Sequence, residues 1–372
     1  MYPMRNLLNV FVAITLTAFF ASCGKTKSAD PPLTKDREEA VYVATDNNNF
    51  ISYNAINGAK KWEVILNGSC KGTPVLYRKR IYIHTDANFL YSIDILTGEI
   101  ARSTNTGFPS TLAITAFNGR IYIAADKLYC YDTTLSQIWT YDGAAPCTSS
   151  PQVSNDKIFL GIGDKIHCVD LSGNSVWQSP AVVAGSIKSS PRVSNGVVFY
   201  GAQDKFVYAI KAVDGSPIWS YQTGDKVESS PMIYGGMCLI GATDYDLYCI
   251  DSISGLLRWK YHTLERVNSS PTIHEATNTV LVGSYDFNLY AIDHVSGTLL
   301  WKYPAGSLIK SSPVVFGDLV YFTSFDRYLY CVDARDGKLV WKQFMNANSQ
   351  GSPIVDDLKS GAFSTESGMS KY

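Results

Sequence analysis

The sequence has few charged residues and almost no net charge. Asp, Glu, Lys and Arg make up 17% of its 372 residues, and 32 basic against 33 acidic side chains give a formal net charge of -1. A chain so poor in charge and 46% hydrophobic can bury a large core, which excludes intrinsic disorder. The missing positive field also argues against nucleic acid as a partner.

Motifs for catalysis and metal binding are missing as well. The five His residues show no His-x-x-x-His spacing, and there is no Cys-x-x-Cys, no phosphate-binding glycine loop and no Gly-x-Ser-x-Gly. We therefore expect no enzyme activity, no bound metal and no cofactor.

Long apolar runs are absent except at the N-terminus. A mostly apolar stretch from Leu7 to Phe20 follows a basic residue and ends in small residues before Cys23. This pattern is typical of a secretory signal peptide over residues 1–22, and the stretch is shorter than the roughly 20 residues that a membrane span needs. Residues 23–39 are polar and predicted to be a tether, and residues 357–372 a polar tail.

Cysteine is also sparse, and its positions favour packing over chemistry. The eight cysteines include Cys23, and the other seven cannot all form disulfides with one another. Four of the seven fill a strand position that is Ser or Ala in other repeats, where a thiol acts as a small apolar group. Cys238 and Cys249 lie on adjacent predicted strands and are the only pair that we single out for a bond.

Aromatic residues are plentiful, and the tryptophans mark an internal repeat of about forty residues. Aromatic side chains, 13% of the chain, favour β-structure. All seven tryptophans follow the repeat: Trp62, Trp139, Trp177, Trp219, Trp259, Trp301 and Trp341. A Ser-Ser-Pro motif keeps the same period, ending at Pro151, Pro191, Pro231, Pro271 and Pro313. Arg102 stands where an eighth tryptophan would fall, so the repeat predicts eight units.

Each unit is predicted to contain four short antiparallel strands. In one unit they are residues 311–315, 319–323, 328–332 and 339–342, separated by Gly- and Asp-containing turns. Such a sheet has two apolar faces, so eight copies would stack around an axis as an all-β, eight-bladed propeller over residues 40–356. The first unit lacks its first strand, and we expect residues 352–355 near the C-terminus to supply it and close the ring.

The repeat resembles a known family. The segment from Ala291 to Trp301, Ala-Ile-Asp-His-Val-Ser-Gly-Thr-Leu-Leu-Trp, is similar to the tryptophan-docking motif of pyrroloquinoline-quinone-like (PQQ-like) propeller repeats. Phe-Ala-Ser-Cys at residues 20–23 resembles the lipobox of bacterial lipoproteins, in which the cysteine is lipidated. Eight such blades behind a lipobox look most like the BamB family of outer-membrane assembly lipoproteins.

The repeated residues have structural roles. An acid ends the third strand of most units and is expected to bond the backbone of the following turn: Asp94, Asp132, Asp170, Asp251, Asp293 and Asp333. The tryptophans are expected to pack between blades, each with its N–H on a carbonyl. The unit with Arg102 and the next unit, with a glycine-less turn at residues 133–136, are irregular, through either degeneracy or adaptation to a partner.

One set of polar residues is a candidate binding site. The residue three before each proline of the motif is polar and variable: Lys71, Thr148, Lys188, Glu228, Asn268, Lys310 and Gln350. In a propeller the loop that enters the innermost strand lines the mouth of the central channel, so these side chains should converge there. We predict at most weak anion binding at this mouth, the alternative being a solvated rim of mixed charge.

Three functions are compatible with these features. The first, implied by the resemblance, is a noncatalytic scaffold that binds envelope proteins in outer-membrane β-barrel assembly, lipid-anchored through Cys23 to the outer membrane and facing the periplasm. The second is a quinoprotein dehydrogenase with PQQ and calcium, a class that typically has an adjacent Cys-Cys pair, which this chain lacks. The third is an envelope sensor that binds a glycan or small ligand.

Overall fold

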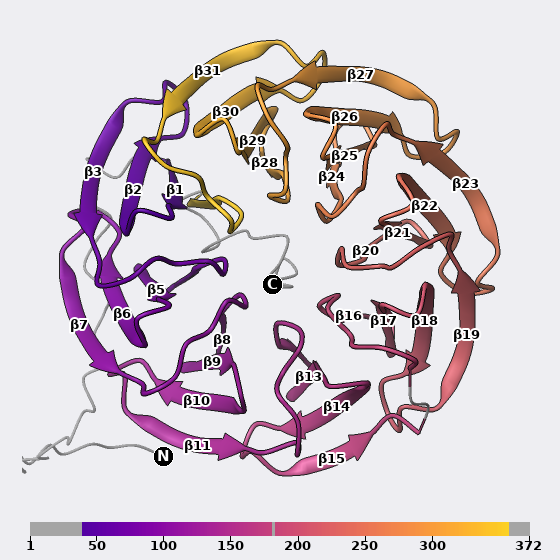
Figure 1. Cartoon of the computed structure of the whole chain (residues 1–372), viewed down its shortest axis with the longest axis horizontal. Coiled ribbons are helices and arrows are strands. Elements are labelled where there is room, and N and C mark those ends of the chain that lie inside the picture. The colour runs from indigo at the N-terminus through magenta and orange to yellow at the C-terminus, as the bar shows by residue number, and fades with distance from the viewer. Residues whose placement is uncertain (1–38, 181–182, 357–372) are drawn as a thin grey trace, which may run out of the picture. The chain divides into compact units, whose positions relative to one another are not determined.

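The computed structural model describes residues 39–180 and 183–356, and these form an all-β propeller. Eight four-stranded antiparallel sheets surround a central axis in these ranges (Figure 1). The predicted fold is confirmed. The predicted signal peptide, Cys23, nearly all of the tether and the polar tail lie outside the described residues.

In each blade the strands are ordered from the axis outward. The innermost strands are β4 (Val75–Tyr77), β8 (Thr115–Phe117), β12 (Gln152–Ser154), β16 (Arg192–Ser194), β20 (Met232–Tyr234), β24 (Thr272–His274), β28 (Val314–Phe316) and β32 (Ile354–Asp356). The second strands are β1 (Ala40–Ala44), β5 (Arg80–His84), β9 (Arg120–Ala124), β13 (Lys157–Ile162), β17 (Val197–Gly201), β21 (Met237–Gly241), β25 (Thr279–Gly283) and β29 (Leu319–Ser324).

The outer half of each blade follows the same order. The third strands are β2 (Asn49–Asn54), β6 (Phe89–Asp94), β10 (Leu128–Asp132), β14 (Lys165–Asp170), β18 (Phe206–Lys211), β22 (Asp246–Asp251), β26 (Asn288–Asp293) and β30 (Tyr328–Asp333). The outermost strands are β3 (Lys60–Ile65), β7 (Ile100–Asn105), β11 (Gln137–Tyr141), β15 (Ser175–Gln178), β19 (Pro217–Gln222), β23 (Leu257–His262), β27 (Leu299–Pro304) and β31 (Leu339–Phe344).

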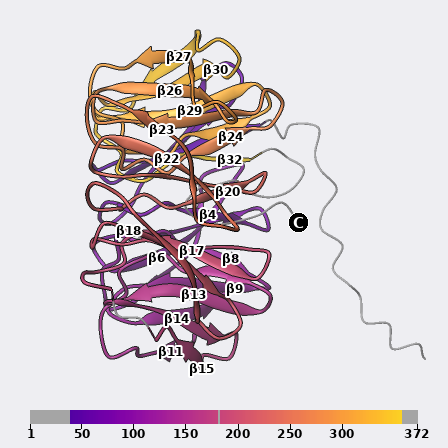
Figure 2. The ribbon, with the colours of Figure 1, turned by 90° about the vertical axis from the view of Figure 1, so that its right-hand side faces the viewer.

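The core lies between blades. Second and third strands are buried almost throughout, since each blade packs both of its faces against a neighbour, and Figure 2 shows the blades edge-on in this stacking. The outermost strands are largely exposed. Innermost strands are shorter than predicted: β28 begins at Val314 instead of residue 311, because Ser311 uses its hydroxyl to bond β29 at the carbonyl of Thr323, 3.0 Å away.

The C-terminal strand closes the ring. Strand β32 pairs antiparallel with β1, with Val355 opposite Val41, and completes the blade that begins at the N-terminus of the described chain. Beside this seam, Trp341 donates its indole N–H to the carbonyl of Ala55 over 3.1 Å. This pairing confirms the predicted closure and removes an exposed strand edge.

The ring has two faces, which we name by their contents. On the turn face each third strand ends and turns into the outermost strand, and the second strand begins beside it, as in the pairing of Ala40 with Asn54. Second strands end on the opposite face, where Gly161 of β13 donates its N–H to Ser149 Oγ over 2.7 Å in the loop that enters β12. We call this opposite face the mouth face.

In each blade that contains the repeat tryptophan, the indole contacts the neighbouring blade. The seven indole N–H groups donate to turn carbonyls of the neighbouring blade over 2.9–3.2 Å: Trp62 to Ile95, Trp139 to Leu171, Trp177 to Ala212, Trp219 to Ser252, Trp259 to His294, Trp301 to Ala334 and Trp341 to Ala55. Each indole also covers a turn glycine of that blade. The tryptophans are thus inter-blade contacts around the ring.

Two further observations concern cysteine and membrane spans. Cys238 lies opposite Ile250 and Cys249 opposite Leu239, and the two thiols belong to different inter-blade clusters on opposite faces of their sheet, so they do not bond. Among the described residues, no helix is long and apolar enough to cross a membrane.

Candidate functional site at the channel mouth

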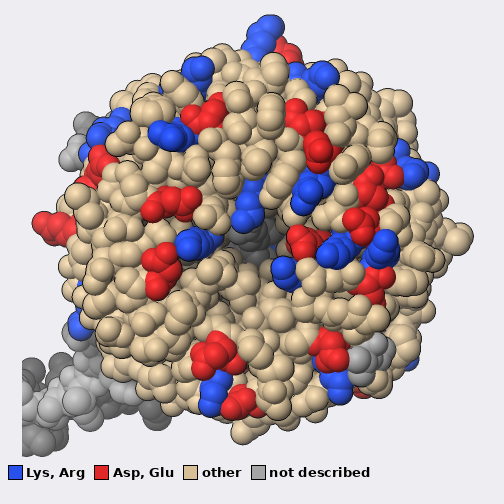
Figure 3. Space-filling view, viewed as in Figure 1, with Lys and Arg blue, Asp and Glu red and all other residues tan. Residues whose placement is uncertain are grey.

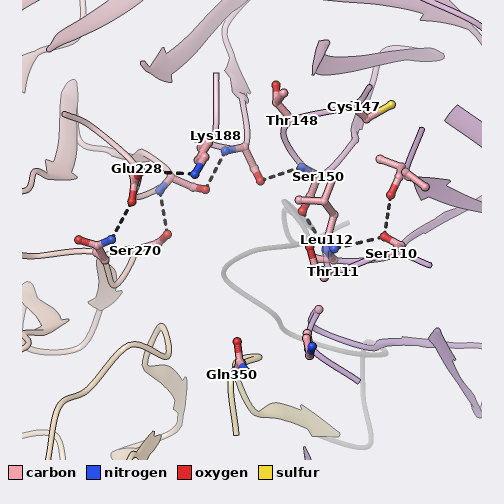
Figure 4. Close-up of a pocket in the computed structure, with 18 of the residues that line it drawn as sticks. Ser110, Thr111, Leu112, Cys147, Thr148, Ser150, Lys188, Glu228, Ser270 and Gln350 are labelled. Atoms are coloured by element: carbon pink, nitrogen blue, oxygen red, sulfur yellow. Dashed lines mark hydrogen bonds and ion pairs between the residues drawn. The ribbon is translucent and has the colours of Figure 1, made fainter. Parts of the chain in front are cut away.

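The polar residues singled out in the sequence meet at one cavity. Lys71, Thr148, Lys188, Glu228, Asn268, Lys310 and Gln350 all line a space of about 660 Å³ on the mouth face (Figure 4). The eighth equivalent residue, Thr111, lines it too, although no Ser-Ser-Pro motif marks its position in the sequence. They converge because each precedes an innermost strand, and the innermost strands surround the axis.

The lysines of the mouth are neutralised unequally. Lys71 Nζ lies 3.4 Å from Asp86 Oδ2, and Lys188 Nζ lies 3.8 Å from Glu228 Oε1. Lys310 forms no ion pair or hydrogen bond with another described residue. Figure 3 shows basic and acidic side chains around the central hollow of this face. The rim is therefore mixed in charge, with one lysine left to solvent or a ligand.

Glu228 is the most tightly held residue of the rim. Its Oε1 accepts a hydrogen bond from Gln203 Nε2 over 2.8 Å, and its Oε2 accepts one from Asn268 Nδ2 over 3.0 Å. Asn268 Oδ1 is buried and has no partner among the described residues. These contacts and Lys188 engage both oxygens of the carboxylate, so Glu228 organises the rim.

Below the rim, the second serine of each motif forms a circular chain of hydrogen bonds. Its backbone N–H donates to the hydroxyl of the equivalent residue in the next blade over 2.8–3.2 Å, in the order Ser150, Ser190, Ser230, Ser270, Ser312, Ser352 and Thr73. Ala113 donates into this chain, at Ser150 Oγ, but has no hydroxyl to accept. In the sequence these serines stand out only as a repeated motif, and the hydrogen bonds between them were not predicted.

The chain of hydroxyls is interrupted at Ala113, beside the apolar part of the cavity lining. Near Ala113 the lining includes Leu112, Ala124, Ala125 and Cys147, an apolar recess beside the polar rim. Burial raises the pKa of the Cys147 thiol to about 12, so it is protonated at neutral pH and a poor nucleophile. The mouth thus combines lysines with an apolar side, a combination that suits an amphipathic anion better than covalent chemistry.

The two irregularities of this region have one structural cause. Where an indole docks, the facing turn has glycine, because a Cβ at Gly255, for example, would lie 2.7 Å from Trp219. Arg102 replaces the tryptophan, and the facing turn has Leu135 at the positive φ position, where its side chain is buried in the vacated space. The loss of tryptophan and the loss of glycine are therefore linked.

The described residues offer little for a metal ion. Within residues 39–180 and 183–356 no three His, Cys, Asp or Glu side chains lie close enough together to hold one. Calcium, which quinoprotein dehydrogenases use beside PQQ, prefers six to eight oxygen ligands. The mouth has one carboxylate, Glu228, whose two oxygens already accept hydrogen bonds from Gln203 and Asn268, and its other side-chain oxygens belong to uncharged residues.

The fold and its repeat define the chain as an eight-bladed propeller of the PQQ-like repeat class. A family model described as "Outer membrane protein assembly factor BamB" matches residues 22–106 and 162–358, which is most of the sequence. The chain belongs to this family. The unmatched part, residues 107–161, includes the blade with Ala113 and Leu135, where the repeat is irregular. Among curated proteins, none matches the sequence.

Solved structures share the fold. BamB from Moraxella catarrhalis is 15% identical with a TM-score of 0.67, covering 76% of this chain and 90% of that one. The computationally designed Ika8 protein is 15% identical with a TM-score of 0.69 over 77% and 90%. Quinohemoprotein alcohol dehydrogenase ADHIIG from Pseudomonas putida HK5 is 12% identical with a TM-score of 0.66 over 78% and 70%. At these identities the likeness shows fold alone.

Proposed function

We propose that this chain is a noncatalytic scaffold of the bacterial cell envelope, with a BamB-like role in the assembly of outer-membrane β-barrel proteins. The observation that supports this most is the family match, which covers blades on both sides of the irregular region. The ring offers partner proteins a polar mouth and many surface loops on a rigid frame.

The proposal includes a lipid anchor at Cys23 and a position at the outer membrane, facing the periplasm. The lipobox-like sequence before Cys23 supports it, as does the family description. A tethered propeller would work as a binding surface held near the site of barrel insertion.

The absence of catalysis is part of the same proposal. No nucleophile activated by a base and no suitable set of calcium ligands lies at the mouth among the described residues. The competing quinoprotein hypothesis is tested by adding PQQ and calcium to the purified protein. We expect no quinone absorbance bound to protein and no dye-linked alcohol oxidation, and either signal would reverse the assignment.

The scaffold role is tested by crosslinking in intact cells. The lipidated protein and its Cys23→Ala variant are each crosslinked and purified, and their partners are identified by mass spectrometry. We expect subunits of the barrel-assembly machinery with the lipidated form only. Recovery of other envelope proteins, or of none, from correctly lipidated protein would retire this role.

A second candidate, ligand binding at the mouth, is favoured by the cavity and by unpaired Lys310. We predict weak binding of small amphipathic carboxylates, with dissociation constants in the millimolar range of a few contacts. Isothermal titration of the protein and of the Lys188→Ala/Lys310→Ala variant measures it. Binding that the double variant does not weaken would exclude the mouth as the site.

A further inference from the structure

Exposed apolar side chains recur at one turn position of the ring. The second residue after the third strand is apolar in five blades: Ile56, Leu96, Val213, Ile253 and Val295, which are 52%, 47%, 67%, 83% and 71% exposed. The other three blades have Thr134, Ser172 and Arg335 there. Single exposed apolar residues are ordinary on protein surfaces, but their repetition at one position needs a cause.

The turn itself does not require an apolar residue. The backbone N–H at this position donates to the residue that ends the strand, as Ile253 does to Asp251 Oδ1 over 3.1 Å. Arg335 makes the same bond to Asp333 Oδ1 over 2.8 Å in a turn of the same length. Since arginine serves this turn as well, the exposed apolar side chains gain nothing from the fold.

These side chains lie on the face where the described chain begins. The carbonyl of Glu39 accepts a hydrogen bond from the N–H of Ala55 over 3.1 Å, one residue before Ile56. Neighbouring turns follow around the same face, linked by the indoles: Trp62 bonds the carbonyl of Ile95, next to Leu96. The apolar tips therefore form a broken ring on the turn face, and the described chain begins beside one of them, Ile56.

The arrangement suits a lipid surface better than a protein. Each tip stands on a separate turn, in two arcs: Ile56 and Leu96 on adjacent blades, and Val213, Ile253 and Val295 on three consecutive blades. Separate apolar tips on one face can all reach a flat layer, as amphipathic membrane-surface segments do with their apolar side chains. From Cys23 to Glu39 the chain can span at most about 55 Å, at up to about 3.5 Å per residue.

We propose that the turn face docks on a phospholipid surface, with these five side chains inserted at the level of the headgroups. The inference rests on the lipid anchor at Cys23 in the proposed function. A lipid anchor on a flexible tether holds a protein near the membrane without fixing its orientation, and the apolar tips would fix which face meets the lipid. The mouth face, at the other end of the strands, would then point away from the membrane towards soluble partners.

Site-directed fluorescence tests this orientation. The seven described cysteines are buried, so a cysteine introduced by Ile253→Cys can be labelled selectively with an environment-sensitive fluorophore. Leu264→Cys is the matched control, since Leu264 is 73% exposed in a loop of the mouth face. The lipidated full-length mature protein, its anchor verified by mass, is reconstituted into phosphatidylethanolamine and phosphatidylglycerol vesicles that contain a lipid-borne quencher.

We expect at least threefold stronger quenching at position 253 than at position 264, with a blue-shifted emission. With the label moved to Ile56→Cys, the variant Val213→Asp/Ile253→Asp/Val295→Asp should lose at least half of its quenching. Equal quenching at positions 253 and 264 would overturn the proposal. A second result would also overturn it: a photo-crosslinker at position 253 forms a discrete adduct with a protein in cells, and the label at that position is not quenched in vesicles.

The outcome is separable from that of the proposed function. Barrel-assembly subunits recovered with the lipidated protein, together with an unquenched label at position 253, would keep the scaffold role and remove the membrane-docking face. Strong quenching at position 253 without recovery of those subunits would keep the membrane-docking face and remove the scaffold role.

Discussion

Each docking tryptophan depends on a glycine in the neighbouring blade. Trp219 covers Gly255, whose φ of +74° is strained for other residues and where an added Cβ would lie 2.7 Å from the indole. Arg102 and Leu135 show the alternative. Arg102 replaces the indole, and the positive-φ position of the facing turn then holds a leucine whose side chain is buried. The pair of positions, more than either residue, determines how two blades join.

Substitutions at Trp219 and Gly255 test this pairing. Gly255→Leu should lower the free energy of unfolding by about 3 kcal/mol, through overpacking and backbone strain. In the Trp219→Arg background, which mimics Arg102 and Leu135, the same change should cost at least about 1 kcal/mol less, because contacting residues are coupled. Urea unfolding of the four proteins measures the cycle, and additive effects would contradict the pairing.

Two buried histidines make stability depend on pH. Burial lowers the pKa of His84 to about 4 and, helped by Lys165, that of His167 to about 4. His84 Nε2 lies 2.8 Å from Thr106 Oγ1, and His167 Nδ1 lies 2.9 Å from the Tyr141 hydroxyl. Both rings are therefore neutral in the folded chain at neutral pH.

Because the unfolded chain binds these protons near pH 6.5, stability should fall as the pH drops from about 6.5 to about 4. Linkage gives an upper bound of about 3 kcal/mol per histidine. Urea unfolding between pH 7.5 and pH 4.5 measures the loss, and His84→Gln/His167→Gln should flatten it. An unchanged slope in the double variant would show that other groups cause the acid sensitivity.

Among the structural elements, the loops that enter the innermost strands hold the ring together at its axis. The hydroxyl of the second serine in each Ser-Ser-Pro loop accepts the backbone N–H of the equivalent residue in the preceding blade, as Ser270 Oγ does from Ser230 over 2.8 Å. The same loops aim the mouth residues at the axis. One motif therefore serves both the inter-blade contact and the candidate site.

Ser270→Ala tests the structural half of this role. The change leaves a partly buried N–H without its acceptor and should cost about 1 to 3 kcal/mol of unfolding free energy. Ser270→Thr is the matched control, since Thr73 already serves this role by accepting from Ser352 over 3.1 Å. Equal losses in both variants would place the effect in packing instead of in the hydrogen bond.

The sequence predicts the strand order and the convergence of the mouth residues, because both follow from the period of the repeat. It does not predict the shape of the cavity. Leu112 and Cys147 line it from the loops that enter β8 and β12, and Ala124 lines it from the end of β9, so its apolar side comes from residues next to the repeated mouth positions as well as from a second strand. The serine chain was also hidden, since its partners are about forty residues apart and each bond joins two copies of one motif.

For the whole molecule, closure of the ring could be predicted from the sequence, whereas the face on which the described chain begins could not. Closure was predictable, because the sequence has an orphan first strand at one end and a blade without one at the other. The placement of the chain's entry on the turn face needed the structure, which bonds Glu39 to the turn of Ile56. The described chain therefore begins on the turn face, opposite the mouth.

The central claim, assistance to barrel assembly, is tested most directly by the outer membrane itself. Cells that lack this chain are complemented with the wild-type protein or with Cys23→Ala, and outer-membrane β-barrel proteins are quantified by mass spectrometry against other lipoproteins. The account predicts a severalfold loss of barrel proteins, restored by the wild-type chain and not by Cys23→Ala. Unchanged barrel protein levels in cells without the chain would contradict it.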